Sequence, residues 1–102
     1  MILDIDKHAK NYIEFIKTKN CSACYDYPTD PDHLNTVGMG NDRKKPRIED
    51  FSCIPLCRKC HTERGQIGDE GFQEKHDINI WKDLNKYLME YLTKWEGVKL
   101  VR

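Results

Sequence analysis

Two cysteine pairs, each with two residues between its cysteines, constrain the fold of this chain more than any other feature. They are Cys21-Ser-Ala-Cys24 and Cys57-Arg-Lys-Cys60. A CxxC turn places two thiolates on one side of a tight loop, and two such turns complete a tetrahedral sulfur site for zinc. Zinc binding would add folding free energy that a chain of 102 residues, with its thin core, needs. We therefore expect these four cysteines to bind one structural zinc.

The cysteines also allow two other interpretations, namely reduced thiols packed in a core and a redox-active CxxC. No βαβ pattern surrounds either pair, which disfavours the redox site. The N-terminus lacks the basic and then apolar segment of a secretion signal, which disfavours disulfides. A fifth cysteine, Cys53, lies outside the pairs, and we expect it to be a small buried strand residue.

The composition narrows the class of protein without naming a partner. Seventeen Lys and Arg balance 17 Asp and Glu, so the net charge indicates no particular ligand. No run approaches the ~20 apolar residues of a membrane-spanning helix, so we expect no membrane association. Two Trp, five Tyr and three Phe are enough to form a core and exclude a wholly disordered chain. We expect one domain over residues 1–102.

Hydrophobic periodicity predicts a helix before the first cysteine pair and two short strands after it. In residues 3–19, apolar residues recur at the spacing of one helix face. The strands are expected at residues 33–37 and 51–56. Between them lies a stretch rich in Pro, Gly and Asn, and long irregular segments of this kind usually carry function in a compact domain.

Three helical segments are expected after the second cysteine pair. One begins near Cys60 and ends by Gly65 or Gly68, and a short one covers residues 72–76. The last belongs to a C-terminal helical extension over residues 72–95, and it has the clearest periodicity. We expect its apolar stripe to form either core or an association face that joins two copies in a homodimer. The stripe consists of Trp81, Leu84, Leu88, Tyr91 and Trp95.

The chain between the cysteine pairs contains Asp32-His33, and His61 directly follows the second pair. Residues 25–56 separate the pairs, which is well beyond the ~15–20 residues of an ordinary double knuckle. If zinc joins the pairs, it brings the three side chains into one neighbourhood. Carboxylate and imidazole groups suit a divalent cation, and an imidazole can accept a proton near neutral pH. The alternative is that Asp32 caps a turn and both histidines are surface residues.

Basic side chains concentrate in the middle of the chain. Residues 40–64 contain seven Lys and Arg against four Asp and Glu. We expect a basic run in this segment to hold a nucleic-acid backbone, with a solvated loop as the alternative. The run consists of Arg43, Lys44, Lys45 and Arg47.

The order of these motifs resembles the HNH nuclease motif. It is a CxxC, then Asp-His, then Pro-Leu-CxxC-His. The resemblance implies a small α+β, zinc-stapled ββα-metal core, with additional N-terminal and C-terminal helices. It covers roughly residues 21–82, with the motif core at 21–65. Four segments more closely resemble the HNH nucleases encoded in bacteriophage recombination regions. They are His33-Leu-Asn-Thr-Val-Gly-Met-Gly-Asn-Asp-Arg, Ile54-Pro-Leu-Cys-Arg-Lys-Cys-His-Thr-Glu, Gln66-Ile-Gly and Lys75-His-Asp-Ile.

The resemblance implies a catalytic role for each of three residues. Asp32 would ligate a catalytic divalent cation, His33 would be the general base that activates water, and His61 would be a second metal ligand. A magnesium-type site is expected, because magnesium readily keeps water ligands. The implied function is metal-dependent hydrolysis of DNA phosphodiester bonds in phage DNA processing or recombination. The implied location is the cytoplasm of a bacterial host, with DNA and a recombination protein as candidate partners.

Two positions depart from the HNH pattern. Ser52 stands where HNH proteins usually carry Asn, and nearby Asp50 is a candidate substitute, as a metal ligand or as a loop tether. Gly65 stands one helical turn after His61, where related phage proteins often carry a further His. Two alternative functions follow. One is a non-catalytic, zinc-dependent nucleic-acid-binding module, and the other is a structural interaction domain that uses the aromatic C-terminal helix.

Overall fold

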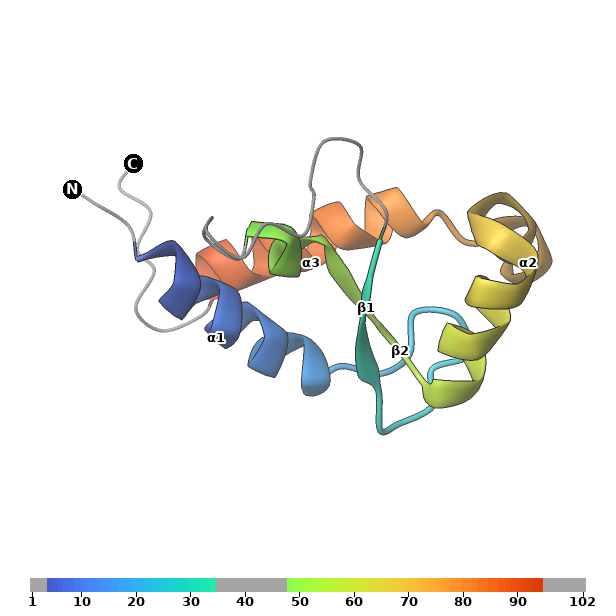
Figure 1. The fold of residues 1–102 in the computed structure, drawn as a ribbon, viewed down its shortest axis with the longest axis horizontal. Coiled ribbons are helices and arrows are strands. Elements are labelled where there is room, and N and C mark those ends of the chain that lie inside the picture. The colour runs from blue at the N-terminus through green and yellow to red at the C-terminus, as the bar shows by residue number, and fades with distance from the viewer. Residues whose placement is uncertain (1–3, 35–47, 95–102) are drawn as a thin grey trace.

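A computed structural model describes residues 4–34 and 48–94 of the chain. Its elements follow the order α1, β1, η1, β2, α2 and α3, where η1 is a short 3-10 helix (Figure 1). The two strands form an antiparallel hairpin, and the prediction of a small α+β domain is confirmed. The basic run at 43–47 and the end of the aromatic stripe, Trp95, lie outside the described residues.

Helix α1 (Ile5–Lys17) lies within the predicted range of 3–19. The side chain of Asp4 caps it by accepting a hydrogen bond from the backbone N–H of Lys7 at 3.1 Å. The buried face of α1 includes two aromatic residues in addition to its aliphatic residues. The buried residues are Ala9, Tyr12, Phe15 and Ile16.

The hairpin consists of β1 (Asp30–His33) and β2 (Cys53–Leu56). The predicted strand at 33–37 was wrong in its bounds, because β1 consists of Asp30–His33 and Leu34 is not in a strand. Residues 35–37 of that prediction lie outside the described residues. Strand β1 reads Asp-Pro-Asp-His and lacks any alternation of apolar and polar residues, which is why the pattern missed it. The second predicted strand also began too early, since residues 51 and 52 belong to η1 (Ile48–Ser52).

Helix α2 (Arg58–His76) joins the first two of the three helical segments that the sequence predicts after the second cysteine pair. Gly68 breaks it with φ 81° and ψ 168°, a backbone conformation that glycine adopts far more readily than other residues. Across this kink, the carboxylate of Glu63 contacts Lys75 and His76, each at 2.5 Å. The kink thus lets the two halves of α2 contact each other.

Helix α3 (Ile80–Lys94) begins where the side-chain oxygen of Asn79 accepts hydrogen bonds from two backbone N–H groups, at 3.1 and 3.0 Å. Its buried face differs from the predicted stripe at the N-terminal end. Ile80 is fully buried and packs in the same cluster as Phe72, whereas Trp81 is 41% exposed. Trp81 is therefore not a core residue, while Tyr91 is buried against α1.

The core consists of two clusters, one on each face of β2. Ile54 and Leu56 belong to the cluster that α2 and α3 cover, which we call the zinc-side cluster. Cys53 belongs to the other, the α1-side cluster, with Tyr12 and Tyr91. Cys53 is fully buried, which confirms the prediction for the fifth cysteine. Among the described residues, no helix is long and apolar enough to cross a membrane.

Candidate metal centre and two acid–histidine pairs

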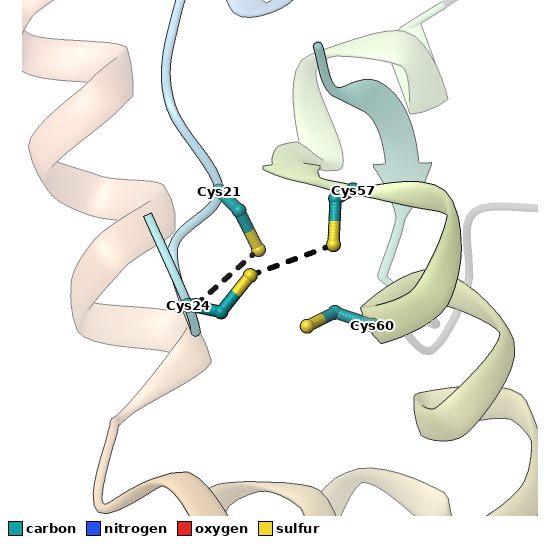
Figure 2. Close-up of side chains that lie close together, drawn as sticks. All are labelled: Cys21, Cys24, Cys57 and Cys60. Carbon is teal, nitrogen blue, oxygen red and sulfur yellow. Dashed lines mark hydrogen bonds between the residues drawn. The ribbon is translucent and has the colours of Figure 1, made fainter. Parts of the chain in front are cut away.

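The two cysteine pairs meet at one end of the hairpin, as the sequence predicts (Figure 2). The first pair lies in the loop that follows α1, and the second pair lies where β2 passes into α2, with Cys57 at the N-cap. One sulfur from each of the four cysteines lies within 4.8 Å of the others. The sulfurs of Cys24 and Cys57 are 3.5 Å apart. Four converging thiols of this kind are consistent with a structural zinc site.

The loop around the first pair favours a thiolate. The backbone N–H of Cys24 donates to the sulfur of Cys21 at 3.5 Å. Burial opposes ionisation of Cys21, but backbone N–H groups outweigh it and lower the pKa of Cys21 to about 7. Desolvation instead raises the pKa of Cys24 to about 11, so of the first pair only Cys21 favours the thiolate, which is the form that binds metal.

Asp32 lies on the zinc-side face of the hairpin, because it pairs with Ile54 across the strands. Its side chain is 2% exposed, and one carboxylate oxygen lies 3.3 Å from Nε2 of His61. His61 stands in the first turn of α2, directly after the cysteine cluster. The structure thus brings together two of the three residues to which the HNH resemblance assigns catalytic roles.

Arg64 donates hydrogen bonds to both oxygens of Asp32, although it was not among the site residues predicted from the sequence. Its Nε donates to one oxygen at 2.6 Å and its Nη2 to the other at 2.9 Å. The guanidinium also contacts Asp69 and donates to the backbone carbonyl of His33 at 3.1 Å. The hydrogen bonds to Asp32 raise the pKa of Arg64, so the group stays charged. The available signal was its spacing, since residues three apart on a helix share a face and Arg64 follows His61 by three.

His33 lies on the opposite face of the hairpin from Asp32, because it pairs with Cys53 of the α1-side cluster. Its Nε2 is 2.7 Å from a carboxylate oxygen of Asp50. The His33 side chain is 49% exposed, whereas that of Asp50 is only 10% exposed. Asp50, which the sequence offered as a metal ligand or loop tether, therefore contacts the candidate base.

Ser52 holds the segment that enters β2. Its hydroxyl donates to the carbonyl of Glu49 at 2.6 Å and lies 3.3 Å from the carbonyl of Leu34. The N–H of Leu34 donates in turn to the carbonyl of Ser52 at 2.9 Å. Ser52 thus links the end of β1 to η1, which is a loop-holding role.

The site consists of two acid–histidine pairs on opposite faces of β1, so the expectation that all three predicted side chains share one neighbourhood is not met for His33. Asp32 with His61 lies on the zinc side, and His33 with Asp50 lies on the α1 side. Arg64 contacts a residue of each pair, because it donates hydrogen bonds to the carboxylate of Asp32 and to the backbone carbonyl of His33. Within residues 4–34 and 48–94, the only group of three or more acidic, His or Cys side chains with converging ligand atoms is the four-cysteine cluster.

Comparison with known proteins places the chain in a family. It is 35% identical over 54 residues to the "Uncharacterized protein YdfU" of Escherichia coli (strain K12). That alignment covers 53% of this chain and 15% of the relative, so the chain matches only a small part of the relative's length. No solved structure matches the chain. A match over residues 5–90 shows that the chain belongs to the family described as "Protein of unknown function (DUF968)", a description without an HNH assignment.

Proposed function

We propose that this protein is a metal-dependent, HNH-type endonuclease that hydrolyses DNA phosphodiester bonds. One observation carries the proposal: the buried carboxylate of Asp32 lies 3.3 Å from Nε2 of His61, beside the cysteine cluster. The next residue, His33, is half-exposed and paired with an acid. A setting in phage DNA processing or recombination is part of the proposal and rests on the sequence resemblance.

Asp32 and His61 would hold the catalytic cation. A carboxylate oxygen and an imidazole nitrogen are suitable donors for magnesium or manganese, and water would complete the coordination. When bound, the cation would neutralise the scissile phosphate and stabilise the leaving oxygen. Arg64 now donates to both oxygens of Asp32, so it would share this carboxylate with the cation.

His33 would accept the proton from the attacking water, which requires the scissile phosphate to contact groups on both faces of β1. Its Nε2 is held by Asp50, and a carboxylate in this position fixes the orientation and the tautomer of an imidazole. With Nε2–H donated to Asp50, Nδ1 is the nitrogen that can accept a proton. The ring is half-exposed, so a substrate can approach it from solvent.

The test is cleavage of supercoiled plasmid and of single-stranded DNA by the zinc-loaded protein with added magnesium, manganese or nickel. We expect His33→Ala to nick ~10²–10⁴-fold more slowly than wild type, the range of a general-base contribution. His76→Gln is the matched control, because His76 contacts Glu63 and belongs to neither acid–histidine pair. Equal nicking by wild type and His33→Ala would show that the assigned base is wrong.

Arg64 also favours a second candidate, a non-catalytic, zinc-dependent nucleic-acid-binding module. In that case, the guanidinium takes permanently the place beside Asp32 that a cation would need. This candidate predicts DNA binding without cleavage by any added metal. It also predicts that Asp32→Asn, which keeps the shape of the side chain, leaves DNA affinity unchanged.

A further inference from the structure

A groove of about 670 Å³ runs between α1 and the hairpin, on the face that His33 occupies. Four residues of α1 line one wall, namely Asp6, Lys10, Ile13 and Lys17. Pro31 and His33 of β1 line the other wall, together with Asp50 of η1. The candidate base therefore opens into a groove whose far wall belongs to a helix outside the HNH-like segment.

The residues of α1 that line the groove form one helical face. Ile13 lies between Lys10 and Lys17, at steps of three and four residues. The two lysines are seven residues apart, which is ~10 Å along the helix axis. Charges on one strand of duplex DNA are ~3.4 Å apart along its axis, so this distance spans about three of them. The two side chains thus match the scale of a short stretch of nucleic-acid backbone.

The two lysines are the charged groups of the groove walls that suit a phosphate strand, and they face two acids, Asp6 and Asp50, on the same walls. Both lysines are exposed. Lys17 lies 3.4 Å from Glu14, an exposed pair one helical turn apart that contributes little energy. Of the two acids on the walls, Asp50 is hydrogen-bonded to His33, and Asp6 lies at the N-terminal end of the α1 face. Ile13 on one wall and Pro31 on the other are apolar and can pack against a sugar.

We propose that this groove binds the phosphodiester backbone of a DNA strand, with Lys10 and Lys17 contacting phosphates on either side of His33. The inference rests on the proposed function, because the bound strand would be the substrate on which His33 acts as the base. It adds a contact surface on α1 that the basic run at 43–47 does not include.

The experiment measures DNA affinity of the zinc-loaded chain by fluorescence anisotropy over a series of KCl concentrations, without added divalent cation. Labelled single-stranded and duplex oligonucleotides serve as separate probes. The variant is Lys10→Gln/Lys17→Gln. The matched control is Lys7→Gln/Lys82→Gln, which removes the same charge from exposed helix positions that do not line the groove.

We expect the groove variant to flatten the plot of log affinity against log salt by ~1.8 for duplex or ~1.4 for single-stranded DNA, since each lost phosphate contact lowers the slope by ~0.9 or ~0.7. The control should keep the wild-type slope. An unchanged slope in the groove variant, an equal change in both variants, or no salt-dependent binding by wild type would overturn the inference. If the groove variant binds DNA as the wild type does, only the groove inference fails. The nuclease proposal is then still tested separately by the nicking rate of His33→Ala. Conversely, intact groove binding without nicking would contradict the nuclease proposal alone.

Discussion

Asp32 is a carboxylate that is 2% exposed, and burial of this kind is strongly unfavourable unless the charge is paired. Arg64 meets this need with two hydrogen bonds, in the bidentate geometry that guanidinium and carboxylate groups favour. The pair also ties β1 to α2, because the same guanidinium reaches the carbonyl of His33. Arg64 therefore stabilises the candidate site whether or not a cation also binds there.

We predict that Arg64→Met lowers the free energy of unfolding by about 3–5 kcal/mol, because it leaves Asp32 buried and without its cationic partner. Urea denaturation of the zinc-loaded protein at pH 7 measures the change. Arg58→Met is the control, since the pair between Arg58 and Asp30 is exposed and should contribute about 0–1 kcal/mol. Equal destabilisation by the two variants would contradict a special role for Arg64.

At the residue scale, the sequence predicted contacts that depend on local spacing and missed those that depend on strand pairing. The four cysteines were found because CxxC spacing alone places two thiols together. The regular pairing of β1 with β2 turns Asp32 and His33 to opposite faces, and only the three-dimensional arrangement shows which acid or base each one meets. The contacts of Asp50 with His33 and of Arg64 with Asp32 could not be predicted for this reason.

At the element scale, α2 depends on a glycine that is not helical. Gly68 has φ 81° and ψ 168°, whereas Gly65 lies within the regular part of the helix. A Cβ at either position would meet no heavy atom within 4 Å, so the two sites differ in backbone conformation and not in available space. They form a matched pair of sites for the same substitution.

We predict that Gly68→Ala lowers the free energy of unfolding by about 1–3 kcal/mol, the usual strain of a side chain in that backbone region. Gly65→Ala should raise it by about 0.5–1 kcal/mol, because alanine favours a helix interior. Chemical denaturation of both variants with zinc bound gives the two values. A stabilising Gly68→Ala would mean that the kink does not require glycine.

The helices were more predictable than the strands. Periodicity identified α1 and the long part of α3, because an apolar face repeats over several turns. Strand β1 has four residues, three of them polar and one proline, so its strand character comes from pairing with β2 and not from its own sequence. The sequence pattern of β1 alone therefore could not fix its bounds.

At the scale of the whole molecule, the cysteine cluster joins the loop after α1 to the start of α2. Three of its four cysteines, Cys21, Cys57 and Cys60, are also part of the zinc-side cluster of the core. Structural zinc contributes ~10–16 kcal/mol in small zinc-binding domains, which is comparable to the ~5–15 kcal/mol of total stability of a typical domain. The order of hairpin and helix was predicted from the apolar segments and from the HNH resemblance, and the cysteine motifs predicted only that the two pairs meet.

We predict that removal of zinc by a chelator, under reducing conditions, abolishes cooperative thermal unfolding, and that added zinc restores it. Circular dichroism measures the thermal unfolding of the metal-free and the zinc-loaded chain, and metal analysis measures the zinc content of each. Cys60→Ala should lose the stoichiometric zinc, whereas Cys53→Ala should keep one zinc per chain because Cys53 lies outside the cluster. A metal-free chain that still unfolds cooperatively would show that the core alone maintains the fold.

The composition of β1 has a consequence for how the protein behaves in concentrated solution. In the described part of the chain, β1 pairs with β2 alone, so its other side is an edge to which a strand of another molecule could add. Pro31 has no N–H to offer such a strand, and the whole strand is only four residues long. The short polar strand thus protects the hairpin against edge-to-edge aggregation.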